Sequence, residues 1–134
     1  MDKKISKDNE IKLAWAMIVK GDVQEAVILT RSLRTIVPYI DALFITATYV
    51  KDIKEVKEVK QVAKMFNAHF SVYKWNYNFS NARNYNFSQV PKKYEYIGWC
   101  DADDIIRGAK YFKKDIEIAE ENGWDAISAW YLYD

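Results

Sequence analysis

Apolar residues along this chain fall into short continuous runs that alternate with stretches of helical spacing. Residues 11–19 form a nearly unbroken apolar run, which predicts a strand buried on both faces. Asp22 is a plausible cap for a following helix, because apolar residues recur at helical spacing from Val23 to Val37, where Pro38 ends the pattern. The start of the chain therefore predicts a strand, a turn and a helix.

The same alternation continues through the rest of the chain. Strands are expected at residues 42–46, 69–73, 94–100 and 124–131, and helices at residues 51–67, 80–89 and 111–121, with Ser80 as the cap of the middle helix. This order predicts an α/β fold, with a mostly parallel central sheet flanked by helices. A chain of 134 residues suffices for one core, so we expect a single domain over residues 1–134, of which residues 1–10 form a flexible lead-in.

Composition and charge exclude several classes of function. The formal net charge is +1, so no overall field attracts nucleic acid or an anionic membrane. No apolar run is long enough for a signal peptide or a membrane span, and the lone cysteine, Cys100, excludes an internal disulfide. We therefore expect a cytoplasmic protein that binds no nucleic acid. Its many aromatic residues exceed what a small core can bury, so several are expected to line a surface groove.

The segment Asp101-Ala-Asp-Asp104 is the first candidate for functional chemistry. It directly follows a predicted strand, and ligands of parallel α/β sheets bind beyond the carboxyl ends of strands. In an extended chain Asp101 and Asp103 point the same way, while Asp104 begins a turn. Crowded carboxylates require a compensating cation, and oxygen ligands favour Mg²⁺ or Mn²⁺ with a diphosphate completing the coordination. The alternative is a polar turn whose carboxylates cap a helix.

Arg83 is the second candidate for functional chemistry. It falls in the first turns of the helix that follows the third predicted strand. From that position a guanidinium group can reach a phosphate or stack on a nucleotide base. The alternative is an exposed helical arginine without a binding role.

Three segments together resemble the family 2 glycosyltransferases, which have the GT-A fold. They are Ala16-Met-Ile-Val-Lys20, Trp75 with Phe79-Ser-Asn-Ala-Arg-Asn84, and Trp99-Cys-Asp-Ala-Asp-Asp104. They occur in the family's order and at its spacing, over about residues 11–106. The resemblance implies a Rossmann-like domain that binds a nucleotide-diphosphate sugar, a UDP-sugar first of all, together with a divalent cation, Mn²⁺ or Mg²⁺.

The resemblance also implies roles for individual residues. Ile18 and Val19 would line the nucleoside pocket. Arg83 would contact the nucleotide, Asp101 the ribose and Asp103 the metal ion. These five assignments come from the family and are expectations for this chain.

The chain departs from the family's pattern after its second predicted strand. Family members usually have an aspartate there that meets the base, whereas this chain has Ile45-Thr-Ala-Thr-Tyr49, and Asp52 matches only the last aspartate of the family's stretch. Thr46 can still form one hydrogen bond to a nucleotide, but a neutral hydroxyl cannot replace a carboxylate that accepts from two donors. The only histidine, His69, begins a strand and is expected to be structural or to face solvent.

These expectations converge on the donor domain of a glycosyltransferase. The cation would neutralise the departing diphosphate while the sugar passes to an acceptor. The family's acceptor half, with its catalytic carboxylate, lies downstream of the matched part. We therefore expect inefficient transfer by the isolated chain. A missing C-terminal domain or a second copy in a homo-oligomer is expected to cover its open sheet edge or its exposed aromatic residues. The alternative is a non-catalytic module of the same fold that binds a nucleotide, a sugar or a protein partner. The neutral Thr46 favours this alternative, whereas Arg83 and Asp103 favour the enzyme.

Overall fold

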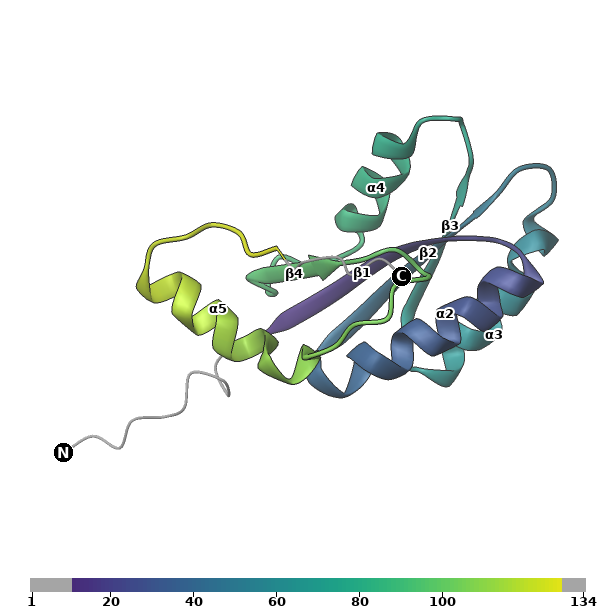
Figure 1. Cartoon of the computed structure of the whole chain (residues 1–134). Coiled ribbons are helices and arrows are strands. Elements are labelled where there is room, and N and C mark those ends of the chain that lie inside the picture. Colours follow the sequence, from purple (N-terminus) through teal and green to yellow (C-terminus); the bar gives the residue numbers. More distant parts are fainter. Residues whose placement is uncertain (1–10, 129–134) are drawn as a thin grey trace.

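The computed structural model describes residues 11–128 and has an α/β architecture (Figure 1). Four strands of this part form an all-parallel sheet in the order β3-β2-β1-β4. They are β1 (Leu13–Lys20), β2 (Ala42–Tyr49), β3 (His69–Lys74) and β4 (Tyr96–Trp99). The predicted fold class, a parallel sheet flanked by helices, is confirmed. Residues 1–10, the predicted lead-in, lie outside the described residues.

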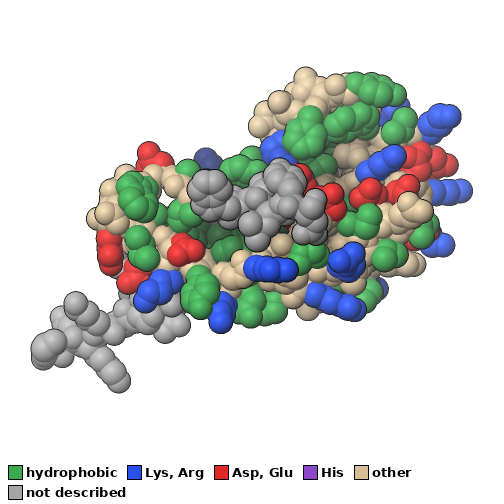
Figure 2. All heavy atoms as spheres, viewed as in Figure 1, with side chains coloured by type: hydrophobic (Ala, Val, Ile, Leu, Met, Phe, Trp, Pro, Cys, Tyr) green, Lys and Arg blue, Asp and Glu red, His purple; other side chains and the backbone are tan. Residues whose placement is uncertain are grey.

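Helices cover both faces of the sheet. They are α2 (Val23–Ile36), α3 (Lys57–Met65), α4 (Phe79–Ser88) and α5 (Phe112–Glu121), with the 3-10 helices η1 (Val37–Tyr39), η2 (Ile53–Val56) and η3 (Ala109–Tyr111). α2, α3 and α5 share the larger core with one face, whereas α4 packs on the other face against Ala14 and Ala16 of β1. Lys and Arg side chains gather along the lower edge of the molecule, where α2 lies (Figure 2). No helix within residues 11–128 is long and apolar enough to cross a membrane.

The turn after β1 is closed by two local interactions. Asp22 caps α2 as predicted, and its carboxylate accepts a hydrogen bond of 2.7 Å from the N–H of Gln24. The N–H of Gly21 donates to the carbonyl oxygen of Thr48 at 2.8 Å. A Cβ atom on Gly21 would lie 2.8 Å from that same oxygen, so a larger residue could not approach β2 so closely.

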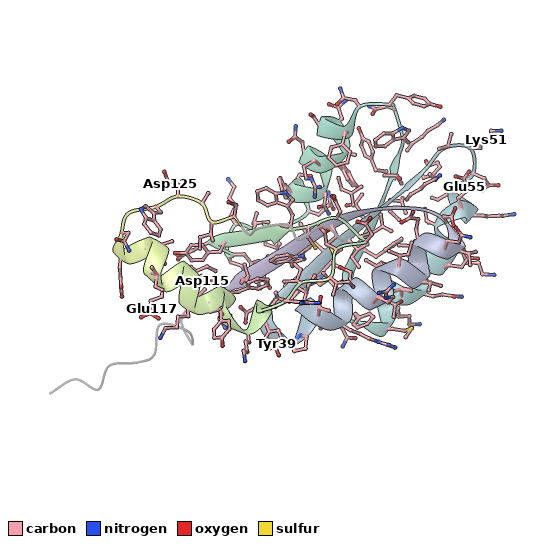
Figure 3. All side chains as sticks on the ribbon, in the orientation of Figure 1. Tyr39, Lys51, Glu55, Asp115, Glu117 and Asp125 are labelled. Carbon is pink, nitrogen blue, oxygen red and sulfur yellow. The ribbon has the colours of Figure 1, made fainter. Side chains whose placement is uncertain are left out.

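The loop after β2 is organised around the carboxylate of Glu55. This group accepts hydrogen bonds from the N–H groups of Val50, Lys51 and Asp52, at 3.0, 2.9 and 2.8 Å. Asp52 and Glu55 form a capping box, in which the Asp52 carboxylate accepts from the backbone N–H of Glu55 and the Glu55 carboxylate accepts from the N–H of Asp52. The Asp52 carboxylate also accepts from the N–H of Lys54 at 2.9 Å. Lys51 and Glu55 lie together at this loop in Figure 3. Asp52, the match to the family's last aspartate, therefore serves as a helix cap here.

Several local predictions are wrong. The helix expected over residues 51–67 begins as the 3-10 helix η2, and only Lys57–Met65 is α-helical. α4 is capped by Asn78 and not by Ser80, because the Asn78 side chain accepts from the N–H of Asn81 at 3.0 Å. Residues 124–128 form no strand, and the rest of the strand predicted to reach residue 131 lies outside the described residues.

The contact between β1 and β4 depends on a residue without a side chain. Trp15 pairs in register with Gly98, and a Cβ atom on Gly98 would lie 2.1 Å from a ring carbon of Trp15. The same ring stacks on Phe112 of α5, with 5.0 Å between centroids and 9° between planes. Trp15 therefore joins β1, β4 and α5.

Asp41 fixes the amino end of the sheet. Its carboxylate accepts from the N–H of Leu13 at 2.8 Å and pairs with Nζ of Lys113 at 2.9 Å. Burial acts to raise the pKa of Asp41, but the hydrogen bond from Leu13 and the charge of Lys113 outweigh it and hold the pKa below its usual 3.8. The carboxylate thus ties β1 and α5 to the start of β2.

We expect Asp41→Asn to lower the free energy of unfolding at pH 7 by less than about 1 kcal/mol, since the ion pair is partly exposed and screened. Because the folded pKa is lowered, the contribution of the charge is fully present above the unfolded pKa and is lost as pH falls through the folded value. Urea unfolding at several pH values between neutral and acid should show that the free energies of unfolding of wild type and Asp41→Asn converge as pH falls. The exposed change Asp115→Asn is the control, and a gap independent of pH would assign the effect to packing and not to charge.

Candidate functional site

The strand order places a topological switch point between β1 and β4. α2 and α3 carry the chain from β1 outward to β2 and β3, whereas α4 crosses the other face to bring β4 to the opposite side of β1. Ligands of open α/β sheets bind at such a point, beyond the carboxyl ends of the strands. The last pair in register joins Ala16 to Trp99, and β1 continues from there to Lys20. The residues after β4 therefore leave the sheet beside the carboxyl-terminal half of β1.

The acidic segment forms a tight turn and not the extended chain that the alternation predicts. The N–H of Asp104 donates to the carbonyl of Asp101 at 3.0 Å, and the Asp104 carboxylate accepts from the N–H of Asp101 at 2.9 Å. The turn brings together one carboxylate oxygen each from Asp101, Asp103 and Asp104, all within 4.8 Å of one another. Asp101 and Asp103 are exposed, and Asp104 is half-buried. Such a group of hard oxygen ligands fits Mg²⁺ or Mn²⁺.

The polar-turn alternative accounts for only part of this cluster. Asp104 closes the turn through both its N–H and its carboxylate. The exposed carboxylates of Asp101 and Asp103 are not needed to close it, and their proximity raises the electrostatic energy unless a cation is present. Asp103 as the metal ligand remains a prediction that this geometry suits.

Arg83 is brought to the same edge by α4. Its guanidinium lies over the rings of Phe79 and Phe87, at 5.3 and 5.8 Å from the ring centroids. Its Nη1 is buried and has no hydrogen-bond partner within residues 11–128. Burial lowers the pKa of Arg83, and the nearby charge of Asp101 acts in the opposite direction. A buried donor without a partner costs about 1–3 kcal/mol, which an anionic ligand would recover.

The aromatic surroundings of Arg83 were missed at the sequence level. Phe79 and Phe87 stand four residues before and after Arg83, the spacing at which helical side chains meet, so the signal was available. Trp99 of β4 contacts Phe87 edge to face, with 5.5 Å between centroids, and is 56% exposed. Phe79 is 55% exposed. The predicted aromatic surface therefore includes the rings of Phe79 and Phe87 that contact the guanidinium of Arg83.

Two of the predicted pocket residues lie inside the protein. Val19 is buried in the core beneath α2 and α3, whereas Ile18 is half-buried. Thr46 is fully buried, and its hydroxyl hydrogen-bonds to Ser71 at 2.8 Å and to the amide of Asn86 at 3.0 Å. Of these three candidates, Ile18 is the one with accessible surface at the end of β1. Nucleotide contacts by all three remain predictions.

Asn86 is a positioning residue that sequence reasoning did not single out. Its fully buried amide also donates to the carbonyl of Phe44 at 3.2 Å, so it ties α4 to the interior of β2. Arg83 lies one helical turn earlier on α4. The hydrogen bonds of Asn86 therefore set the position from which Arg83 reaches the edge of the sheet.

Cys100 and His69 lie outside the candidate ligand set. Burial raises the pKa of the Cys100 thiol to about 11, and the neighbouring carboxylates of Asp104 and Asp101 also raise it. The thiol is therefore protonated at neutral pH and packs in the core below the acidic turn. His69 begins β3 as expected, and its ring stacks on Phe44 at 4.6 Å.

Comparisons with known proteins show similarity of structure only. No family model and no curated protein sequence matches this chain. Residues 1–349 of S. aureus TarS in complex with UDP-GlcNAc are similar, with a TM-score of 0.52 and 15% identity over 84% of this chain and 32% of that chain. The same protein in complex with UDP gives a TM-score of 0.46 and 12% identity, over 84% and 33% of the two chains. This chain spans about a third of the length of those structures. It therefore shares the α/β fold of one part of TarS.

Proposed function

We propose that this chain is the donor-binding domain of a glycosyltransferase. It holds a nucleotide-diphosphate sugar through Arg83 and through a divalent cation at residues 101–104. One observation carries the proposal: a buried guanidinium donor that has no hydrogen-bond partner among residues 11–128 lies with three convergent carboxylates at the switch point of the sheet. The resemblance of the motifs to family 2 glycosyltransferases supports the same assignment. So does the fold shared with TarS, which was solved with UDP-GlcNAc.

The two groups together select the class of ligand. A carboxylate cluster alone suits a hydrated cation, and an arginine alone suits any anion. Asp101 of the carboxylate cluster is close enough to Arg83 to act on its charge, so one ligand can contact the cluster and Arg83 together. A ligand there must offer oxygens to a metal ion and also accept from a guanidinium. A diphosphate meets both requirements, because its several charged oxygens can coordinate the cation and accept from the guanidinium at the same time.

Each residue has a distinct task in this proposal. Asp103, which is exposed, supplies a ligand to the cation, while Asp104 keeps the turn closed. Asp101 is assigned to the ribose, and Arg83 orients the nucleotide. A bound Mg²⁺ or Mn²⁺ would neutralise the charge that develops on the departing diphosphate.

Acceptor activation is not assigned to any residue within 11–128. Glu117 and Asp125 lie at the α5 end of the molecule, away from the carboxyl end of β1 (Figure 3). A base on the far side of the anomeric carbon contributes roughly 10²–10⁴-fold to the rate. We therefore propose that the isolated chain binds the donor and at most hydrolyses it slowly.

A non-catalytic nucleotide-binding module of the same fold is the second candidate. The observation in its favour is the engagement of Thr46, whose hydroxyl bonds to Ser71 and Asn86 within the protein. The family's base-binding carboxylate thus has no equivalent at this position. Slow hydrolysis of UDP-GlcNAc that depends on Mn²⁺ would exclude this second candidate, whereas rapid turnover with a defined acceptor would contradict the slow hydrolysis proposed above.

We expect calorimetric titration to show UDP and UDP-GlcNAc binding in the presence of Mn²⁺, and much weaker binding in EDTA. Arg83→Lys keeps the charge but loses the planar fork, so it should weaken binding about tenfold, and Arg83→Ala about tenfold or more. Arg31→Lys and Arg31→Ala, on the exposed side of α2, are the matched controls. GDP in place of UDP tests base selectivity.

The proposal fails on either of two results. Equal affinity for UDP with Mn²⁺ and with EDTA would show that no cation takes part in binding at this site. Unchanged affinity in both Arg83 variants, accompanied by lower stability, would make Arg83 a structural anchor between Phe79 and Phe87.

A further inference from the structure

Charged side chains are segregated over the surface, although the formal net charge is only +1. Every exposed charged residue on α2, η2 and α3 is basic; these residues are Arg31, Arg34, Lys54, Lys57, Lys60 and Lys64. The acidic residues of the same elements are less exposed than these cations. Glu25 and Glu58 are half-buried, and the Glu55 carboxylate accepts three backbone hydrogen bonds. By contrast, α5 exposes three acidic residues and one lysine.

Apolar side chains are exposed among these cations. Val23 and Val27 of α2 are 58% and 62% exposed, Ile53 of η2 is 53% exposed, and Met65 of α3 is 69% exposed. On α2, Val23, Val27 and Arg31 succeed one another at intervals of four residues, so they share one stripe of the helix. Basic and apolar side chains adjoin along the lower edge of the molecule in Figure 2.

α2 and α3 present these side chains in a common direction. The two helices contact each other and pack on the same face of the sheet. Their exposed sides therefore form one outer layer, here called the basic layer. It consists of the six cations named above with Val23, Val27, Ile53 and Met65.

We propose that the basic layer docks onto an anionic lipid surface. At physiological ionic strength charges are screened beyond about 8 Å, so the local excess of cations decides such binding and not the net charge of the chain. Each Lys or Arg close to an anionic leaflet strengthens binding about fivefold. Exposed Val, Ile and Met side chains gain further by entering the boundary between headgroups and acyl chains. A nucleic-acid backbone would engage the cations and leave these apolar side chains in water.

Docking through the basic layer leaves the candidate site accessible. α4, which carries Arg83, lies on the opposite face of the sheet, and the acidic turn lies at the carboxyl edge. The inference rests on surface charge and exposure alone. It stands or falls independently of nucleotide binding.

Co-sedimentation with vesicles tests this proposal. We expect the chain to bind vesicles that contain phosphatidylglycerol, to bind phosphatidylcholine vesicles much more weakly, and to dissociate as salt is raised. The triple change Lys57→Gln, Lys60→Gln and Lys64→Gln should lower the partition coefficient on the order of 100-fold. Lys114→Gln on α5 removes one exposed cation outside the basic layer and should have little effect.

A second set of variants separates lipid from other anions. Val27→Ser with Met65→Ser should weaken vesicle binding while leaving its salt dependence unchanged, because no charge is altered. Circular dichroism establishes that each variant is folded. Equal binding to neutral vesicles, or full binding by the triple variant, would overturn the proposal. Two results together would assign the basic layer to a soluble polyanion. Polyphosphate or single-stranded DNA would bind the chain as tightly as vesicles do, and the Val27 and Met65 changes would have no effect on binding.

Discussion

Asp103→Ala is expected to abolish the Mn²⁺ dependence of UDP binding. The three carboxylates lie within 4.8 Å of one another, and Asp103 is an exposed member that is not needed to close the turn. Even residues that only support a metal ligand change metal affinity about 10–100-fold, so loss of a direct ligand should cost at least about 100-fold. Titration of UDP into wild type and variant, with Mn²⁺ and with EDTA, measures the effect. The two curves of the variant should coincide.

Two further carboxylate variants make this test specific. Asp104→Asn keeps an oxygen that can accept from the N–H of Asp101, so it probes charge while preserving the turn. Asp115→Ala removes an exposed carboxylate of α5 and should leave UDP binding unchanged. Persistence of Mn²⁺-dependent binding in Asp103→Ala would mean that residues 101–104 form only a polar turn.

Gly98→Ala is expected to destabilise the fold by about 2–3 kcal/mol, a large part of the stability of an ordinary domain. The added methyl group would meet two ring atoms of Trp15 at 2.1 and 2.3 Å. Trp15 is only 6% exposed and is stacked on Phe112, so its ring has little room to move away. Urea unfolding compares the two free energies.

The same substitution in a Trp15→Leu background identifies the cause. Leucine lacks the large ring that crosses Gly98, so the penalty for Gly98→Ala should fall well below its value in wild type. An equal penalty in both backgrounds would assign the cost to the backbone of β4. In that case the ring of Trp15 is not what requires glycine at this position.

The order of strands and helices was largely predictable because local patterns are strong here. The continuous apolar run before Lys20 and the cap at Asp22 define β1 and the start of α2. β2 runs to Tyr49, three residues beyond the predicted end at Thr46, because pairing with β1 and β3 continues through these partly polar residues. Pairing depends on neighbouring strands and is invisible to a local pattern.

The exact caps and turns were less predictable. Asn78 and Ser80 are both good capping residues, and the backbone conformation of Asn78 decides between them. The acidic segment departs from the strand direction because Asp104 can close a turn on Asp101. Alternation within a strand says nothing about where pairing with the next strand stops.

The candidate site was also predictable only in part. Ligands of parallel α/β sheets bind beyond the carboxyl ends of the strands, and this rule was enough to place Arg83 and the acidic segment at one edge of the sheet. The apolar run predicted that Val19 is buried, but a strand that is apolar on both faces carries no signal for which side chain points to which helix. The partners of Thr46 lie 25 and 40 residues away in sequence, so its hydrogen bonds follow from tertiary structure alone.

Glu55 has a consequence for the energetics of any ligand at the carboxyl edge. By accepting from three successive N–H groups, it fixes the loop after β2 within the free protein. Gly21 then links the turn after β1 to Thr48 at the end of β2. The loop after β2 and the turn after β1 are therefore already ordered before a ligand binds there. The protein then loses little conformational entropy on binding. Loosening the loop would weaken affinity through preorganisation, while every direct contact to the ligand stayed in place.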